Sequence, residues 1–157
     1  MTTTEIQRPQ RPPSIVPILN PLIRRLLRIG MPMGPNILLT IRGRTTGQPR
    51  TFPITLMEAG GRQYVFATFG ETNWVRNLRA SGRATVRRGR HEYSVVATEL
   101  TPEEAAPVLQ AALGRFIHSP AAPLVRRFYP LGPDSTPEDY LRETRRHAGF
   151  ELTEETR

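Results

Sequence analysis

Residues 43–50, with the sequence GRTTGQPR, combine residue types that bind a negatively charged group. Glycine lets a backbone approach a ligand closely. Free backbone amides, threonine hydroxyls and arginine side chains can all donate hydrogen bonds to phosphate. Arg44 and Arg50 are placed to clamp such a group from the two ends of the segment. The segment lacks the lysine and the following helix of a Walker loop, and a plain surface hairpin is the alternative interpretation.

A second segment, residues 67–78 with the sequence ATFGETNWVRNL, contains a polar turn followed by residues with the spacing of a helix. Trp74, Asn77 and Leu78 are spaced i, i+3 and i+4, which puts them on one face of a helix. An indole can pack against a planar heterocycle, and an amide can hydrogen-bond the edge of that heterocycle. The alternative is a tryptophan that packs in the hydrophobic core, since large aromatic side chains are mostly buried.

Together the two segments resemble the deazaflavin-dependent nitroreductase and quinone reductase family of actinobacteria, whose members have a split β-barrel and use coenzyme F420. LLTIRGRTTGQPRTFPI (38–54) is similar to the family's Gly-Arg-x-Ser/Thr-Gly-x-x-Arg loop and the proline that follows it. FATFGETNWVRNLRASGRATV (66–86) is similar to its strand end of small and hydroxyl residues, followed by Trp-x-x-Asn-Leu-x-Ala. The resemblance covers residues 20–100 well and the C-terminal third loosely.

The resemblance implies a cofactor site built from both segments. The loop would hold the phosphate and acidic tail of the cofactor, and Phe52 and Pro53 would border the deazaflavin ring. The strand end would line the other edge of the ring. Ring placement would fall to Thr68, Trp74 and Asn77, and no catalytic acid or base is assigned. The implied cofactor-binding residues are Arg44, Thr45, Thr46, Gly47, Gln48, Arg50, Phe52, Pro53, Phe66, Ala67, Thr68, Phe69, Gly70, Trp74 and Asn77.

The composition is that of a globular protein and excludes several kinds of site. Apolar residues make up 38% of the 157 residues, which is enough for one core. The chain has no cysteine, which excludes a disulfide scaffold and a thiol nucleophile. The three histidines, His91, His118 and His147, are scattered and form no His-x-x-x-His pair, so no metal is expected.

All 22 basic residues are arginine, and the net charge is +8. The excess lies in the first half of the chain: residues 1–50 carry +7, residues 51–100 carry +3 and residues 101–157 carry −2. Nucleic acid, an anionic membrane surface and a polyanionic small molecule are the partner classes that such a charge favours. The aromatic residues are not interleaved with arginine as base-stacking platforms require, so we expect no nucleic-acid partner.

The N-terminal part of the chain has two regions of different composition. Proline, threonine and arginine dominate residues 1–17, which predicts a flexible arm ahead of one cofactor-binding domain over residues 18–157. Residues 20–30 predict an amphipathic helix between Asn20 and Gly30, and this helix packs either on the barrel or weakly on an anionic membrane. No apolar run reaches the roughly 18–20 residues of a membrane span, and no secretory signal is recognisable. The expected location is cytoplasmic, with or without peripheral contact with the cell membrane.

The middle of the chain has the pattern of short antiparallel strands. Turn residues at 58–61 and 89–90 predict hairpins, and Pro53 predicts an edge strand, a strand start or a bulge. The expected strands span residues 36–42, 51–58, 62–68, 83–88 and 91–99, with one helix over 73–80. This pattern is typical of a small antiparallel barrel.

The last third has helix start signals at Thr101 and Thr136. Pro107 is expected to kink or delay the first helix, and the second is expected to run to about His147. Residues 149–152 predict a final strand. The expected fold is therefore mainly β with helices (α+β): a split β-barrel similar to the FMN-binding split barrels, with an N-terminal amphipathic helix and C-terminal helices.

The sequence shows no nucleophile–His–Asp arrangement and no acid–base pair. Cofactor-based redox chemistry needs neither, because the ring of the cofactor carries the hydride. We therefore expect hydride transfer from reduced F420 to a quinone, nitro compound or other electron-poor small molecule. An FMN-dependent split-barrel oxidoreductase and a non-catalytic barrel that binds a ligand or lipid are the alternatives. Both a monomer and a homodimer are compatible with the sequence.

Overall fold

The computed structural model describes residues 21, 25 and 36–156, and seven strands of this part form one antiparallel sheet. The strand order is β2-β1-β5-β6-β7-β4-β3, and every neighbouring pair is antiparallel. The strands are β1 (Asn36–Arg42), β2 (Pro49–Thr55), β3 (Met57–Ala59), β4 (Arg62–Phe66), β5 (Arg83–Arg88), β6 (His91–Glu99) and β7 (Gly149–Glu154).

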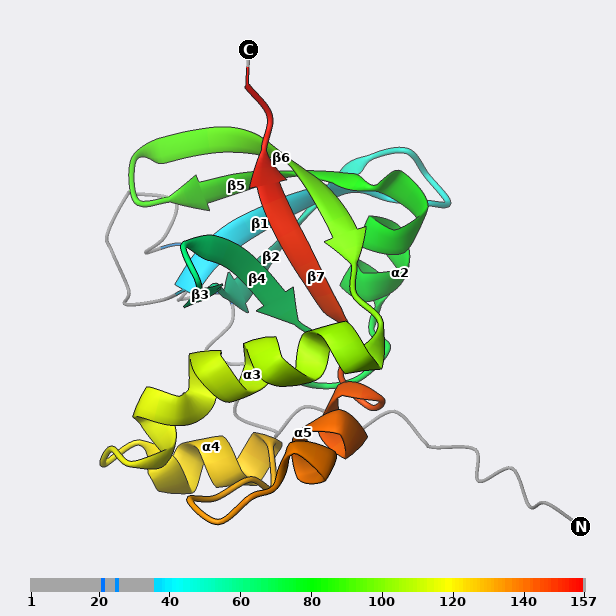
Figure 1. Ribbon diagram of the computed structural model, residues 1–157. Coiled ribbons are helices and arrows are strands. Elements are labelled where there is room, and N and C mark those ends of the chain that lie inside the picture. Colours follow the sequence, from blue (N-terminus) through cyan, green and yellow to red (C-terminus); the bar gives the residue numbers. More distant parts are fainter. Residues whose placement is uncertain (1–20, 22–24, 26–35, 157) are drawn as a thin grey trace, which may run out of the picture.

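The helices of this part of the chain form two groups that lie against different parts of the curled sheet. The helix α2 (Asn73–Ser81) packs beside β1, β5 and β6, close to the loop that joins β1 to β2. The helices α3 (Pro102–Ile117), α4 (Ala122–Phe128) and α5 (Pro137–Thr144) lie together at the other end of the sheet (Figure 1). The α+β split-barrel fold expected from the sequence is confirmed.

The side chains of β4 point alternately into two clusters of buried hydrophobic residues. Val65 and Ala67 point into the cluster between the sheet and α2. Tyr64 and Phe66 point into the cluster under α3 and α5. Successive strand residues face opposite sides of a sheet, so one short strand connects both clusters. The end of β4 is therefore held on both faces.

The single strand expected over residues 51–58 is wrong, because the structure has two strands that separate at the buried Leu56. The first, β2, pairs with β1, whereas β3 pairs with β4. These two strands are the opposite edges of the sheet, and the chain passes from one edge to the other between them. Pro53 lies within β2, an edge strand, so of the three positions expected for it (edge strand, strand start or bulge) the structure shows the edge. A proline has no N–H to donate to a further strand.

The expected C-terminal elements are partly confirmed. Thr101 and Thr136 each form a capping box. The predicted delay at Pro107 is wrong, because α3 starts at Pro102 and continues to Ile117. A proline in the second turn removes only one backbone hydrogen bond near the start of the helix.

Several further boundaries differ from the expectation: β2 begins at Pro49 rather than at residue 51, α2 ends at Ser81 rather than at residue 80, and β7 ends at Glu154 rather than at residue 152. The helix α5 ends at Thr144 rather than at about residue 147, and the short α4 has no counterpart among the expected helices. The strand β4 ends at Phe66 rather than at residue 68. The expected arm over residues 1–17 lies outside the described residues, as does the expected helix over 20–30 apart from Pro21 and Arg25.

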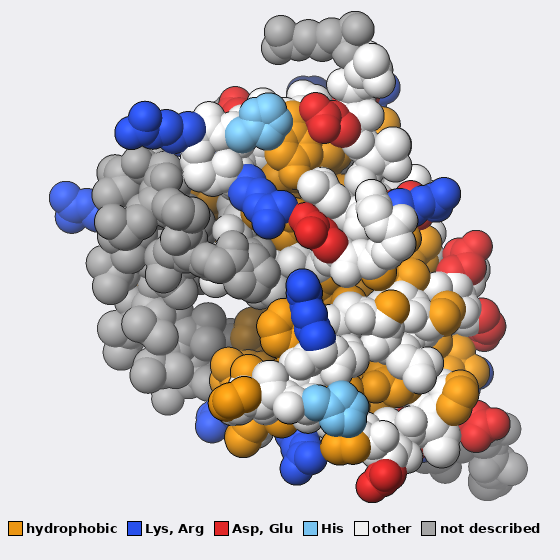
Figure 2. All heavy atoms as spheres, turned by 60° about the vertical axis from the view of Figure 1, so that its left-hand side comes forward, with side chains coloured by type: hydrophobic (Ala, Val, Ile, Leu, Met, Phe, Trp, Pro, Cys, Tyr) orange, Lys and Arg blue, Asp and Glu red, His pale blue; other side chains and the backbone are white. Residues whose placement is uncertain are grey.

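The surface shown in Figure 2 mixes charge types. Basic side chains on this face stand apart from one another, with acidic and apolar side chains between them. Among the described residues, the exposed large hydrophobic side chains are Val96 and Leu124, which lie on different elements. Within the same residues, no helix is long and apolar enough to cross a lipid bilayer.

Gly149 at the start of β7 is required by the close approach of Phe66. A Cβ atom built on Gly149 would lie 2.6 Å from Cε1 of the Phe66 ring. Phe66 is buried and cannot move without disturbing the core, so Gly149→Ala should lower the free energy of unfolding by about 1–3 kcal/mol. Urea unfolding measures this change.

The matched control is Gly114→Ala in α3, where an added Cβ meets no atom within 4 Å. This substitution should raise the free energy of unfolding by about 0.5–1 kcal/mol, because alanine is the better helix former. Equal unfolding midpoints for Gly149→Ala and the parent protein would contradict the packing described for Phe66.

Candidate functional site

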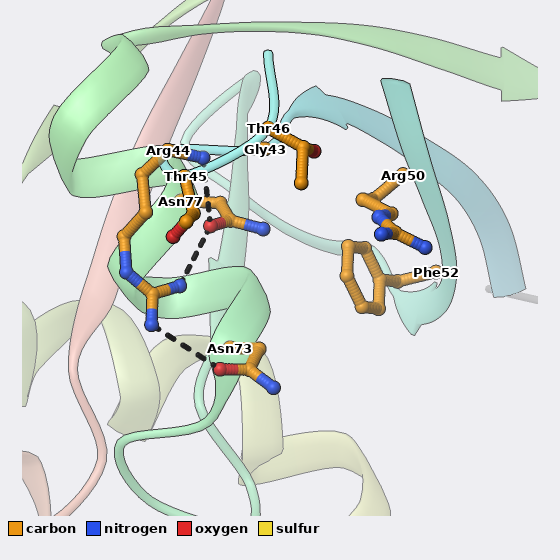
Figure 3. A pocket seen from close by; sticks show the side chains of 8 residues that line it. All are labelled: Gly43, Arg44, Thr45, Thr46, Arg50, Phe52, Asn73 and Asn77. Atoms are coloured by element: carbon orange, nitrogen blue, oxygen red, sulfur yellow. Dashed lines mark hydrogen bonds between the residues drawn. The ribbon is translucent and has the colours of Figure 1, made fainter. Parts of the chain in front are cut away.

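A pocket of about 410 Å³ lies between the β1–β2 loop, the strand β2 and the helix α2 (Figure 3). This volume is within the roughly 300–1,000 Å³ of small-molecule sites. The lining includes two arginines and no acidic residue. The residues that line the pocket are Gly43, Arg44, Thr45, Thr46, Arg50, Phe52, Asn73 and Asn77.

The β1–β2 loop is closed by its own backbone. The Gly43 N–H donates to the Gln48 carbonyl at 2.8 Å, and the Gly47 N–H donates to the Gly43 carbonyl at 2.9 Å. Gly47 has a φ of +71°, which favours glycine. A Cβ on Gly43 would lie only 3.1 Å from the Gln48 carbonyl oxygen. The two glycines thus allow a compact loop, and this loop forms one wall of the pocket.

Asn77 joins this loop to α2. Its side chain is only 5% exposed, and its Oδ1 accepts hydrogen bonds from the Arg44 backbone N–H at 3.3 Å and from Arg44 Nη1 at 2.8 Å. Arg44 Nη2 also donates to Asn73 Oδ1 at 3.4 Å. The carbonyl end of Asn77 is therefore engaged by Arg44, and its amide nitrogen points into the pocket (Figure 3).

The opposite wall comes from β2. Arg50 and Phe52 alternate with Thr51, whose hydroxyl instead shares a 2.9 Å hydrogen bond with Thr40 on β1. Figure 3 shows Arg50 and Phe52 across the pocket from the asparagines of α2. Among the described residues, no acidic side chain pairs with the Arg50 guanidinium. The pocket therefore combines two arginines, an amide donor, threonine hydroxyls and one aromatic ring, which suits an anionic ligand with a planar part.

The other site residues expected on or near the loop lie outside this lining. Gly47 and Gln48 form the backbone hydrogen bonds with Gly43 that close the loop, and Pro53 lies in β2. Trp74 is half-buried against the core, with its ring centroid 6.1 Å from that of Phe150. Trp74 and Asn77 lie on the predicted helix, but their side chains have different neighbours: Trp74 packs near Phe150, and Asn77 bonds to Arg44.

The expected residues at the end of β4 form a separate group next to the C-terminal helices. Phe66 and Ala67 are buried in the two core clusters. Thr68 shares a 3.1 Å hydrogen bond with the Tyr129 hydroxyl, and Phe69 contacts Phe128 edge to face at 5.5 Å between ring centroids. Gly70 follows in the turn, with a φ of +76°. Glu71 and Thr72 join this group to the pocket residue Asn73 at the start of α2, and none of its members lines the pocket.

Sequence reasoning missed Asn73 and Tyr129. Asn73 had a usable signal, because it precedes Asn77 by one helical turn and so shares its face. Tyr129 had none, since 61 residues separate it from Thr68 and only the tertiary fold joins them. Burial raises the pKa of Tyr129 to about 12, so its hydroxyl stays protonated at neutral pH.

One buried hydroxyl of the described residues has no hydrogen-bond partner. It is Oγ1 of Thr72, the N-cap residue of α2, which makes no side-chain cap bond. A threonine in this position normally caps the helix or binds another group. Thr72 directly precedes the pocket residue Asn73, but its Oγ1 is buried and does not line the pocket. No group of three or more potential metal ligands occurs in the part of the chain that the structure describes.

Solved structures with a similar fold include that of an F420-H2 dependent reductase (FDR-A), at 20% identity and a TM-score of 0.53. That match covers 76% of this chain and 94% of the other. A structure described as a domain-swapped dimer matches at 19% identity and a TM-score of 0.55, over 89% of this chain and all of the other. An Agrobacterium tumefaciens protein of unknown function matches at 17% identity and a TM-score of 0.54, over 96% of this chain and 60% of the other. At these identities the likeness shows the fold alone.

The fold and the pocket together define a split-barrel protein with a pocket lined by two arginine side chains. The model of the F420H(2)-dependent quinone reductase family matches residues 27–115, which include the whole β1–β2 loop, β2 and α2. The chain belongs to this family of oxidoreductases. The family match confirms the deazaflavin relationship expected from the sequence and gives no support to the FMN alternative.

The hydrogen bonds between Arg44 and Asn77 should hold the loop over residues 43–48 in place. We expect Asn77→Ala to lower the free energy of unfolding by about 1–3 kcal/mol, because it leaves donors of Arg44 unpaired. Amide hydrogen exchange in this loop should become faster by about tenfold or more, since each lost hydrogen bond is worth about that factor. Exchange followed by mass spectrometry measures the second effect.

Asn73→Ala is the matched control, since its 3.4 Å bond to Arg44 is exposed. We expect it to leave loop exchange close to that of the parent protein. If both variants exchanged equally, Asn77 would have no special role in holding the loop.

Proposed function

We propose that the protein binds reduced F420 and transfers its hydride to a quinone, a nitro compound or another electron-poor small molecule. The observation that carries the proposal is the pocket formed by Arg44, Arg50 and Asn77, where two cations and an amide donor converge without a neighbouring acidic side chain. The family match is a second, independent support. No hydrolytic machinery competes with this interpretation.

The pocket chemistry suits the anionic half of F420. This cofactor carries a phosphodiester and an oligoglutamate tail, so arginine side chains and free N–H groups are the partners that it requires. Arg50, which has no ion-pair partner among the described residues, would bind the tail or the phosphate, whereas Arg44 is already bonded to α2 and would add one further contact. FMN has a single phosphate and would use this cationic pocket less fully.

When bound, the cofactor would supply the hydride from its deazaflavin ring. The part of the protein is then to bind, orient and shield that ring. Phe52 and the amide nitrogen of Asn77 are the pocket groups suited to a ring face and a ring edge. The end of β4, with Thr68 and Phe69, and the indole of Trp74 are proposed to border the ring further from the phosphate.

We also propose a domain organisation, an acceptor class and an assembly for the protein. Residues 18–157 form one cofactor-binding domain, and the acceptor is a small molecule. The helix expected over residues 20–30, which lies outside the described residues apart from Pro21 and Arg25, is proposed to pack on the barrel or to contact an anionic membrane surface, and the proposed location is cytoplasmic. A homodimer is the favoured assembly, since a structure of the same fold is a domain-swapped dimer.

The proposal is tested by stopped-flow oxidation of reduced F420 with menadione as acceptor. The parent protein should accelerate the oxidation, and Arg50→Ala should raise the apparent KM for F420 by about tenfold to a hundredfold, the effect of one charge-assisted contact. The kcat at saturation should stay nearly unchanged, because a tail contact is similar in the ground and transition states.

Arg88→Ala provides the control, since Arg88 is exposed and pairs with Glu58 away from the pocket. It should leave the KM unchanged. Raising the salt concentration should weaken F420 binding to the parent protein more than to Arg50→Ala, because exposed charge pairs are screened. An unchanged KM in Arg50→Ala, or no oxidation by the parent protein, would contradict the proposal.

A further inference from the structure

Two ionisable side chains are buried away from the pocket. Glu143 on α5 and His147 just after it are each 2% exposed. His147 Nε2 lies 3.5 Å from Glu143 Oε2, one helical turn apart. Burying an unpaired carboxylate costs several kcal/mol, so such a pair is kept only where the geometry joins the partners. Glu143 has no other ion-pair partner among the described residues.

The other nitrogen of His147 has a defined role. Nδ1 lies 2.8 Å from the carbonyl oxygen of Ala67, 80 residues earlier in the chain. A carbonyl can only accept, so Nδ1 carries a hydrogen and donates it. Nε2 is left to face Glu143. The Nδ1 hydrogen bond to Ala67 therefore leaves Nε2 as the ring atom next to the Glu143 carboxylate.

The Ala67 peptide is held from both sides. Its N–H donates to the Ala148 carbonyl at 2.8 Å, and its carbonyl accepts from Gly70 N–H at 2.9 Å as well as from His147. Ala67 is 1% exposed, so its carbonyl has no access to water as a substitute donor. These bonds fix the first half of the turn between β4 and α2.

The same histidine supports the next residue of the turn through an aromatic contact. Its ring packs on the Tyr129 ring with centroids 4.7 Å apart, and the Tyr129 hydroxyl is bonded to Thr68. The turn then reaches Asn73, which opens α2 and lines the pocket. His147 therefore contacts the turn at its start, while the pocket lies at its end.

We infer that His147 is a positioning residue: its bond to the Ala67 carbonyl fixes the turn over residues 67–72, and with it Thr68 and the start of α2. Glu143 keeps the imidazole oriented for this bond. The expected effect of His147 on hydride transfer rests on the proposed function. The placement of the turn itself can be measured without the cofactor.

The test compares two double variants that differ only in the donor to Ala67. Both carry Glu143→Gln, which removes the buried carboxylate charge. His147→Asn retains an N–H donor, because its amide nitrogen is attached to Cγ as Nδ1 of histidine is. His147→Ala has no donor. Each is assayed for amide exchange without cofactor, for F420 affinity by titration, and for kcat with menadione.

We expect the asparagine double variant to keep a kcat within about threefold of the parent protein, and the alanine double variant to lose about tenfold to a hundredfold. The F420 dissociation constant should agree within about threefold between the two variants, because neither touches the pocket directly. Exchange over residues 67–73 should be faster only in the alanine variant. His118→Ala, an exposed histidine after α3, is the control and should change none of these values.

Equal kcat and equal exchange in the two double variants would overturn the inference. If the alanine variant fails to fold, the asparagine variant alone decides, since a loss of more than about tenfold in its kcat would show that the donor to Ala67 is not what matters. If the parent protein does not oxidise reduced F420, the proposed function fails, and the exchange comparison still decides whether His147 positions the turn.

Discussion

The candidate site depends on the bond between Arg44 and Asn77. These residues are 33 positions apart, and their contact is where the loop after β1 meets the helix α2. Because Asn77 is buried, an unsatisfied amide there would be costly, and Arg44 supplies both a backbone and a side-chain donor. The loop is thereby fixed against α2. Arg50 and Phe52 face α2 across the pocket.

A second constraint acts at the end of β4. The side chains of this strand point into both core clusters. The peptide of Ala67, directly after the strand, is hydrogen-bonded to Ala148 and His147 of the C-terminal segment. The two constraints meet in α2, since the helix starts after the held turn and its Asn77 side chain accepts from the loop. The C-terminal third thus contributes to the geometry of the pocket without lining it.

The parts of this arrangement that depend on local sequence could be predicted. The loop after β1 and both capping boxes follow from residue types and short spacings and occur in the structure, although β2 already begins at Pro49 and shortens the loop. The sequence limited Pro53 to an edge strand, a strand start or a bulge, and the structure shows the edge. The break at Leu56 could not be predicted, because it arises when the chain moves between the two edges of a curled sheet. The contacts of Thr68 with Tyr129 and of Ala67 with His147 were also inaccessible, since no periodicity connects residues so far apart.

The pocket between the β1–β2 loop and α2 is proposed to bind the anionic half of a deazaflavin cofactor. The decisive experiment compares the affinity of the protein for F420 with its affinity for the phosphate-free deazariboflavin, by quenching of the single tryptophan, Trp74, or by calorimetry. We predict that F420 binds at least about a hundredfold more tightly, the effect of two charge-assisted contacts. Equal affinities for the two compounds would contradict the account, because the arginines would then contribute nothing to binding.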